Sequence, residues 1–194
     1  MTHSARGAAT RQRILEAAAS VLARTGELEM VAVAAEAGVS EGLPFHYFGT
    51  RSGLLEAVVE DFHTRLADAV VFRAFAGHTW QEREEQRVRA WVRFLLGDPL
   101  APVVLAGMGG DAVVAASWRR RLALAVEAGA RNIAHAQRDG DLPTGSDPEL
   151  LAAAVLGGVQ TAVATALGSD TSRDEIQIAG ALWTFVRSAA EGSP

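Results

Sequence analysis

The stretch Met30–Phe48, MVAVAAEAGVSEGLPFHYF, decides the fold of this chain. Its first half is a short apolar segment with helical spacing, and it runs into Ala37-Gly38-Val39-Ser40 before a second helical segment starts. Two helices joined by a tight turn that contains glycine form a helix-turn-helix. Gly38 suits the turn because a residue without Cβ adopts the left-handed backbone conformation at little cost. The second helix of such a unit enters the DNA major groove, so the sequence predicts a DNA-binding protein.

The residues beside the turn fit the same prediction. Val39 is expected to fill the angle between the two helices. Ser40 is expected to be the N-cap of the second helix, because its hydroxyl can accept a hydrogen bond from an amide of the first turn. The two predicted helices therefore cover residues 30–37 and 40–48.

The rest of the chain has apolar residues at helical spacing, and no segment alternates as a strand would. A first helix is predicted over residues 10–25, and a long one over residues 51–76 after a capping Thr50. Cap signals at Thr79 and Asp147 begin two of the later helices. The prediction is an all-α fold with roughly nine helices.

The length of 194 residues suits a small domain followed by a larger one. We expect a DNA-binding domain over residues 1–51 and a helical domain over residues 52–194. The most apolar stretch, residues 150–167, contains Gln160 and is interpreted as a buried helix rather than a membrane span. Residues 1–9 have no apolar core of a signal peptide. The absence of cysteine excludes disulfides and thiolate chemistry, and it fits a cytoplasmic protein.

The net charge of −5 is unevenly distributed. Residues 1–51 hold five arginines and five glutamates, so the predicted DNA-binding domain is formally neutral. The remainder therefore carries 18 − 5 = 13 arginines against 23 − 5 = 18 acids. Because phosphate contacts supply most of the sequence-independent affinity for DNA, we expect modest phosphate affinity.

The chain resembles the TetR family of transcriptional regulators, most clearly between Arg11 and Leu55. The motifs that carry the resemblance are RILEAA at 13–18, AGVS at 37–40, Gly42, FHYF at 45–48, and Arg51 with Leu54-Leu55. The resemblance implies a three-helix DNA-binding head and a helical body that binds a ligand and dimerises. It further implies a ligand-responsive regulator that binds double-stranded, palindromic operator DNA as a homodimer. Such a regulator is more often a repressor that a small molecule releases from DNA, and it needs no cofactor.

The resemblance also assigns the DNA contacts. The residues expected to face the groove are Ser40, Glu41, Gly42, Leu43, Phe45 and Tyr47, with Arg51 holding a phosphate at the start of the next helix. Leu43 and Phe45 depart from the family pattern, because neither can donate the hydrogen bonds that members often make there. Leu43 could instead touch a thymine methyl group. Glu41 either accepts from a cytosine amino group or is only a first-turn acid that favours the helix dipole.

The body carries large or polar-tipped side chains on aliphatic helices. The resemblance implies a small-molecule pocket among them, for which the candidate residues are Phe62, Trp91, Trp118 and Gln160. The alternative is that the tryptophans are ordinary core residues. The last two helices carry broad faces of Ala and Gly, which let helices approach closely, and we expect them to form a four-helix bundle across a two-fold dimer.

Two other classes of function have some support in the sequence. An enzyme is disfavoured because the five histidines show no metal-ligand spacing and no serine lies in a nucleophile elbow. The glycine-rich segment 107–111 lacks the preceding strand of a dinucleotide site. No catalytic residue and no metal site are therefore predicted. The second alternative is a helical ligand-binding or adaptor protein whose head binds DNA weakly, which the neutral head, Leu43 and Phe45 would favour.

Overall fold

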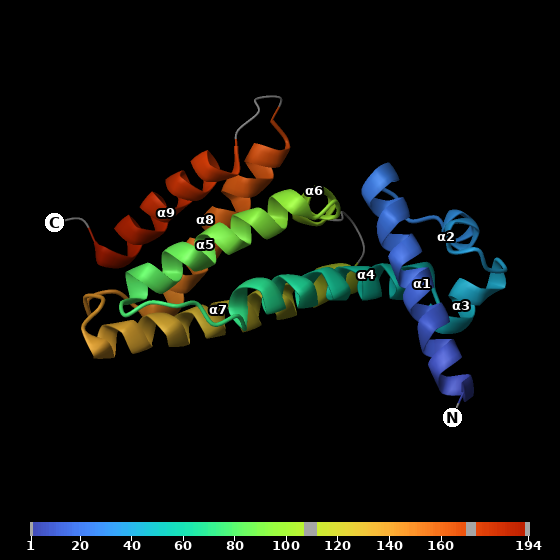
Figure 1. The fold of residues 1–194 in the computed structure, drawn as a ribbon, viewed down its shortest axis with the longest axis horizontal. Helices are drawn as coiled ribbons and strands as arrows, with labels where there is room; N and C mark the ends of the chain where they lie inside the picture. Colours follow the sequence, from blue (N-terminus) through green and yellow to red (C-terminus); the bar gives the residue numbers. More distant parts are fainter. Residues whose placement is uncertain (1, 107–111, 170–173, 193–194) are drawn as a thin grey trace. The chain divides into compact units, whose positions relative to one another are not determined.

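The computed structural model describes residues 2–106, 112–169 and 174–192 (Figure 1). Within these ranges the chain forms α-helices and one π-helix, and it contains no strand, so the predicted all-α fold is confirmed. In chain order the elements are α1 (Thr2–Thr25), α2 (Met30–Ala37), α3 (Gly42–Phe48), α4 (Arg51–Leu66), η1 (Ala67–Val71), α5 (Trp80–Gly97), α6 (Ala101–Leu105), α7 (Ala112–Asp139), α8 (Pro148–Leu167) and α9 (Glu175–Glu191).

The chain divides into two compact units. The first comprises Met1–Thr64 and Pro99–Trp118, and the second comprises Arg65–Asp98 and Arg119–Pro194. The division of function between residues 1–51 and 52–194 remains a prediction.

In the first unit, α1, α2 and α3 pack against one another. Their shared core is aliphatic and fully buried, as at Ile14, Val21, Leu22 and Val33. Gly38 ends α2 with φ 63° and ψ 43°, and its amide donates to the carbonyl oxygen of Ala35 at 3.2 Å. The predicted helix-turn-helix is therefore present, with its glycine in the left-handed conformation.

The start of α3 differs from the prediction. The helix begins at Gly42, with Glu41 at the cap position and no side-chain hydrogen bond to the first turn, so Ser40 is not the N-cap. A capping side chain bonds the amide of the second or third helical residue, and the third is Pro44, which has none. The amide of the second, Leu43, donates to the backbone carbonyl oxygen of Ser40 at 2.9 Å.

The long helix predicted over residues 51–76 is also shorter than expected. Regular α-helix ends at Leu66 and continues as the π-helix η1, where the amide of Phe72 donates to the carbonyl oxygen of Ala67 at 2.9 Å. The carbonyl oxygen of Val70 accepts from the guanidinium of Arg87 at 2.6 Å. The carbonyl oxygen of Val70 thus accepts from a side chain of α5 instead of from a backbone amide further along the chain. This contact explains why the helical segment ends at η1.

In the second unit, α5 packs against η1, α8 and α9, and α8 and α9 run side by side (Figure 1). The caps predicted at Thr79 and Asp147 are confirmed. The hydroxyl of Thr79 accepts from the amide of Glu82 at 3.3 Å. A carboxylate oxygen of Asp147 accepts from the amides of Glu149 and Leu150, both at 2.9 Å. These caps fix where α5 and α8 begin.

The prediction that residues 150–167 form a buried helix is wrong for the single chain. In the most apolar window of α8, with mean hydropathy 1.8, only 17% of the residues are buried. Leu150 is 72% exposed, and Ala153, Ala154, Gly157 and Ala162 are exposed as well. Alone among the described helices, α8 is long and apolar enough to cross a membrane, but length and composition are weak evidence for a span. Much of its apolar surface is therefore left uncovered by its own chain.

Candidate nucleic-acid interface and ligand groove

The predicted groove-facing residues lie on α3 and the turn before it. Ser40, Glu41, Gly42 and Phe45 are exposed, whereas Leu43 and Tyr47 are half-buried. Pro44 is buried and anchors the opposite side of the helix. The helix therefore presents a continuous exposed surface to a partner, with Phe45 at 48% exposure as its largest apolar side chain.

The hydroxyl of Tyr47 lies beside the N-terminal part of α1. A Cβ placed on Gly7 would be 3.6 Å from this hydroxyl oxygen, an ordinary van der Waals distance, so the two residues are neighbours. The imidazole of His46 meets the Tyr47 ring edge to face, with centroids 5.3 Å apart. The N-terminal part of α1 and the end of α3 therefore lie side by side at Gly7 and Tyr47.

Arg51 is exposed at the first residue of α4, as a phosphate contact would require. Its Nε donates to the backbone carbonyl oxygen of Leu28 at 2.7 Å, which directs the guanidinium. The hydroxyl of Thr50 accepts from the amide of Gly53 at 3.0 Å, so Thr50 caps this helix as predicted. An anion at this helix N-terminus would meet both the guanidinium and the positive end of the helix dipole.

Gly53 is a structurally important residue that was not predicted from the sequence. A Cβ at this position would lie 2.4 Å from the backbone carbonyl oxygen of Phe48, far inside van der Waals contact. The first turn of α4 can therefore approach the end of α3 only because residue 53 has no side chain. A glycine early in a helix was the available signal, since glycine is unfavourable inside helices unless packing requires it.

The charges of the head are partly neutralised by local pairs. Arg24 lies 3.3 Å from the carboxylate of Glu36, which also accepts from the hydroxyl of Ser20 at 3.0 Å. The guanidinium of Arg11 lies over the ring of Phe48, 4.8 Å from its centroid. Arg11 and Arg13 are exposed on α1. The pair neutralises one arginine and one glutamate together, so the formal charge of residues 1–51 stays at zero.

The four predicted ligand residues are distributed over both units. Phe62 is fully buried, and the ring of Trp118 lies against the imidazole of His63, with centroids 5.1 Å apart and the planes tilted by 51°; both residues belong to the first unit. Trp91 is 7% exposed and Gln160 is half-buried, and both belong to the second unit. In the described part of the chain, the indole Nε1 of Trp91 has no hydrogen-bond partner. Their grouping in one pocket remains a prediction.

A half-buried polar cluster in the second unit was not predicted. The carboxylate of Glu84 accepts from Arg87 Nε and from Asn132 Nδ2, each at 3.0 Å. Arg87 also bonds the carbonyl oxygen of Val70 and lies over the ring of Phe75, 5.0 Å from its centroid. The cluster ties α5 to α7 and to η1. The i,i+3 pair Glu84 and Arg87 was visible in the sequence, but the contact with Asn132 joins residues that are far apart along the chain.

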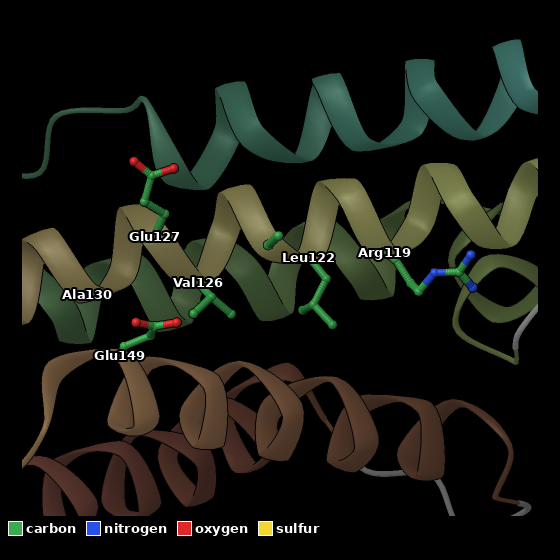
Figure 2. A pocket seen from close by; sticks show the side chains of 7 residues that line it. Arg119, Leu122, Val126, Glu127, Ala130 and Glu149 are labelled. Carbon is green, nitrogen blue, oxygen red and sulfur yellow. The ribbon is translucent and has the colours of Figure 1, made fainter.

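The second unit also contains a groove of about 420 Å³ between α7 and α8 (Figure 2). None of the predicted ligand residues lines it. Its lining residues are Arg119, Leu122, Ala123, Val126, Glu127, Ala130 and Glu149. Among the residues that the structure describes, no cluster of three or more His, Asp or Glu side chains could hold a metal ion.

Comparison with known proteins agrees with this geometry. Residues 14–58, which span the core of α1 through the helix-turn-helix and into α4, match the family described as bacterial regulatory proteins, tetR family. Residues 14–58 are therefore a TetR-family DNA-binding domain. The HTH-type transcriptional regulator BetI 2 of Chromohalobacter salexigens is 40% identical over 68 residues, which are 34% of this chain and 33% of that protein. BetI of Escherichia coli is 36% identical over 84 residues, 42% of each chain. The match thus spans less than half the length of these relatives.

Solved structures of TetR-family proteins share the fold along nearly the whole chain. A TetR-family transcriptional regulator from Pectobacterium atrosepticum is 25% identical, with a TM-score of 0.71 and coverage of 98% of both chains. The transcriptional regulator FadR from Bacillus subtilis, solved in complex with stearoyl-CoA, is 19% identical, with a TM-score of 0.76 over 92% of this chain and 98% of that one. The helical body therefore has the fold found in TetR-family structures, although its sequence has diverged.

Proposed function

We propose that this TetR-family protein is a cytoplasmic repressor that binds a palindromic operator as a homodimer and is released by a small molecule. The observation that carries the proposal is the exposed helix α3, set after a turn whose Gly38 has φ 63°. The contact residues remain those predicted on α3, with Arg51 on a phosphate. Because two-fold symmetric proteins bind half-sites about one helical turn apart, a dimer suits a palindromic site.

The uncovered surface of the last two helices supports the dimer. Leu150 of α8 is 72% exposed, and Ile176 and Phe185 of α9 are 83% and 42% exposed. The exposed face of α8 that follows Leu150 consists largely of alanine and glycine, so a second helix can approach it closely. Because exposed apolar surface of this kind is disfavoured in water, a second copy of the same pair of helices would stabilise it by burial.

Release by a small molecule would follow from a shift in the populations of two conformations of the body. In one conformation of the body, the two heads are wrongly spaced for two successive major grooves. A ligand that binds better to this conformation lowers operator affinity. The complex of FadR with stearoyl-CoA supports the idea that a body of this fold can hold a small molecule. At 19% identity, that likeness concerns the fold and does not extend to the ligand.

Fluorescence anisotropy on labelled DNA from the upstream region of the gene tests the proposal directly. We expect binding to one fragment that weakens as salt rises, since each phosphate contact steepens the slope of log K against log salt by about 0.9. Sedimentation of the complex should give two chains per operator. Binding no tighter than to unrelated DNA of the same length, for that fragment and for a library of random fragments, would contradict the repressor.

The alternative is a helical ligand-binding or adaptor protein with a weakened head. The formally neutral first 51 residues and the apolar Leu43 and Phe45 favour this alternative. The salt series separates the two functions, because an adaptor would show neither a preferred DNA fragment nor a salt-dependent complex.

A further inference from the structure

The groove between α7 and α8 has an apolar floor. Leu122, Ala123, Val126 and Ala130 recur at helical spacing on α7, and the side chains of Leu122 and Val126 point toward α8 (Figure 2). Its volume of about 420 Å³ lies within the range of roughly 300–1,000 Å³ that is usual for small-molecule sites. Such a floor binds an aliphatic chain better than a polar molecule, because burying the chain removes apolar surface from water.

Opposite charges stand at the two ends of this floor. Arg119 lies at one end, and Glu149, in the first turn of α8, lies at the other end near Ala130 (Figure 2). Both side chains are exposed, and within the described residues neither forms an ion pair. Glu127 differs, because its carboxylate pairs with Arg131 and points away from α8. The groove therefore offers one unpaired cation and one unpaired carboxylate to a ligand.

The spacing of the two ends sets the length of the ligand. Arg119 and Ala130 are eleven residues apart on one helix, which corresponds to about 16 Å at 1.5 Å per residue. Near the connection of the two helices, a Cβ on Gly129 would be only 3.1 Å from the Cβ of Ala152. The small side chains thus let α7 and α8 meet closely at one point, which fixes their spacing beside the groove.

We propose that this groove binds a linear aliphatic molecule with a cationic group at one end and a carboxylate at the other, a long-chain ω-amino acid in its simplest form. The ammonium group lies at Glu149, the chain lies along Leu122 and Val126, and the carboxylate lies at Arg119. This ligand is the effector of the proposed repressor, and only that last role rests on the proposed function. The binding itself is tested without DNA.

The probe is 11-aminoundecanoate, compared by titration calorimetry with undecanoate and with undecylamine at neutral pH. All three share the chain, but only the ω-amino acid satisfies both ends of the groove. We expect it to bind about fivefold more tightly than either comparator, the factor expected when a partly exposed charge pair is added. Equal affinity of all three compounds, or no binding of any, would overturn the proposal while leaving the repressor intact.

Two variants with matched controls locate the site. Val126→Trp should fill the groove and reduce affinity for the probe more than tenfold. Leu124→Trp, at an exposed position of the same helix, should leave this affinity unchanged.

Glu149→Gln should remove the preference for the ω-amino acid over undecanoate. Glu85→Gln, which lies outside the groove, should keep this preference. An unchanged affinity in Val126→Trp would place the ligand elsewhere and overturn the assignment.

Two further measurements separate the remaining outcomes. If Val126→Trp instead weakens self-association in sedimentation, the groove is an interface between copies of the chain and the ligand proposal is wrong. In the anisotropy assay, saturating 11-aminoundecanoate should weaken operator binding by wild type but not by Val126→Trp. Binding of the probe with unchanged operator affinity would contradict its role as effector, while failure of the protein to bind any operator would count against the proposed function alone.

Discussion

The guanidinium of Arg51 is held by the backbone of Leu28, whose carbonyl oxygen accepts from Arg51 Nε at 2.7 Å. This bond joins the first residue of α4 to the segment between α1 and α2, while Arg51 as a whole stays exposed. A side chain oriented in this way loses less conformational freedom when it binds a phosphate. Arg51 therefore has both a structural and a predicted DNA-binding role, which substitution can separate.

Arg51→Ala should lower operator affinity and reduce the slope of log K against log salt by about 0.9, because one phosphate contact is lost. It should also lower the free energy of unfolding by about 1 kcal/mol through loss of the hydrogen bond to Leu28. Arg51→Lys should keep most of the salt slope. The control is Arg89→Ala, whose side chain forms a surface pair with Glu85. An unchanged salt slope in Arg51→Ala would show that Arg51 does not touch phosphate.

Gly38→Ala should destabilise the head by about 1–2 kcal/mol, because a residue with Cβ is strained at φ 63°. A Cβ there would meet no atom within 4 Å, so the cost is confined to the backbone. Gly42→Ala is the matched control, since Gly42 also has open space around it but lies in a helix with ordinary φ. In urea denaturation, Gly38→Ala should be less stable than wild type. Gly42→Ala should be as stable as wild type or more stable.

Gly53→Ala should destabilise the junction of α3 and α4 by about 1–3 kcal/mol, because the new methyl group would collide with the carbonyl oxygen of Phe48. The clash involves backbone, which cannot move aside as a flexible side chain would. Gly97→Ala, with open space at its position, serves as the control. Equal midpoints for the two variants in urea denaturation would show that the junction can relax.

Glu84→Leu should cost about 2–3 kcal/mol, because it leaves Arg87 and Asn132 half-buried without their shared acceptor. Glu84→Gln should cost less, since the amide oxygen still accepts one of the two hydrogen bonds. Glu85→Leu, next along the helix and paired only with Arg89, is the control. If Glu84→Leu is as stable as this control in thermal and urea unfolding, the cluster does not stabilise the body.

Ala154→Arg should weaken the proposed dimer, because it places a long charged side chain on the exposed small-residue face of α8. We expect sedimentation equilibrium to show a dissociation constant raised at least tenfold. Ala35→Arg, at an exposed alanine of α2, provides the same substitution away from that face. A wild-type protein that sediments as a monomer at micromolar concentration would contradict the dimer itself.

The amino-acid sequence by itself determined the all-α class and the helix-turn-helix. Both rest on local physics: helical spacing of apolar residues, caps such as Asp147, and the left-handed conformation that Gly38 adopts without strain. The cap predicted at Ser40 is wrong because α3 begins two residues later, at Gly42, and the amide of Leu43 donates to the backbone carbonyl oxygen of Ser40 at 2.9 Å.

Contacts in the tertiary structure decide where the helical segment that follows α4 ends, where the guanidinium of Arg51 lies, and which faces of α8 stay uncovered. Arg87 ends the helix at η1 by bonding the carbonyl oxygen of Val70, seventeen residues earlier in the chain. Leu28 and Arg51 are likewise far apart in sequence. The groove beside Val126 exists because α7 and α8 approach at Gly129 and Ala152. Each of these features depends on contacts between distant segments, for which neither helical spacing nor residue preference carries a signal.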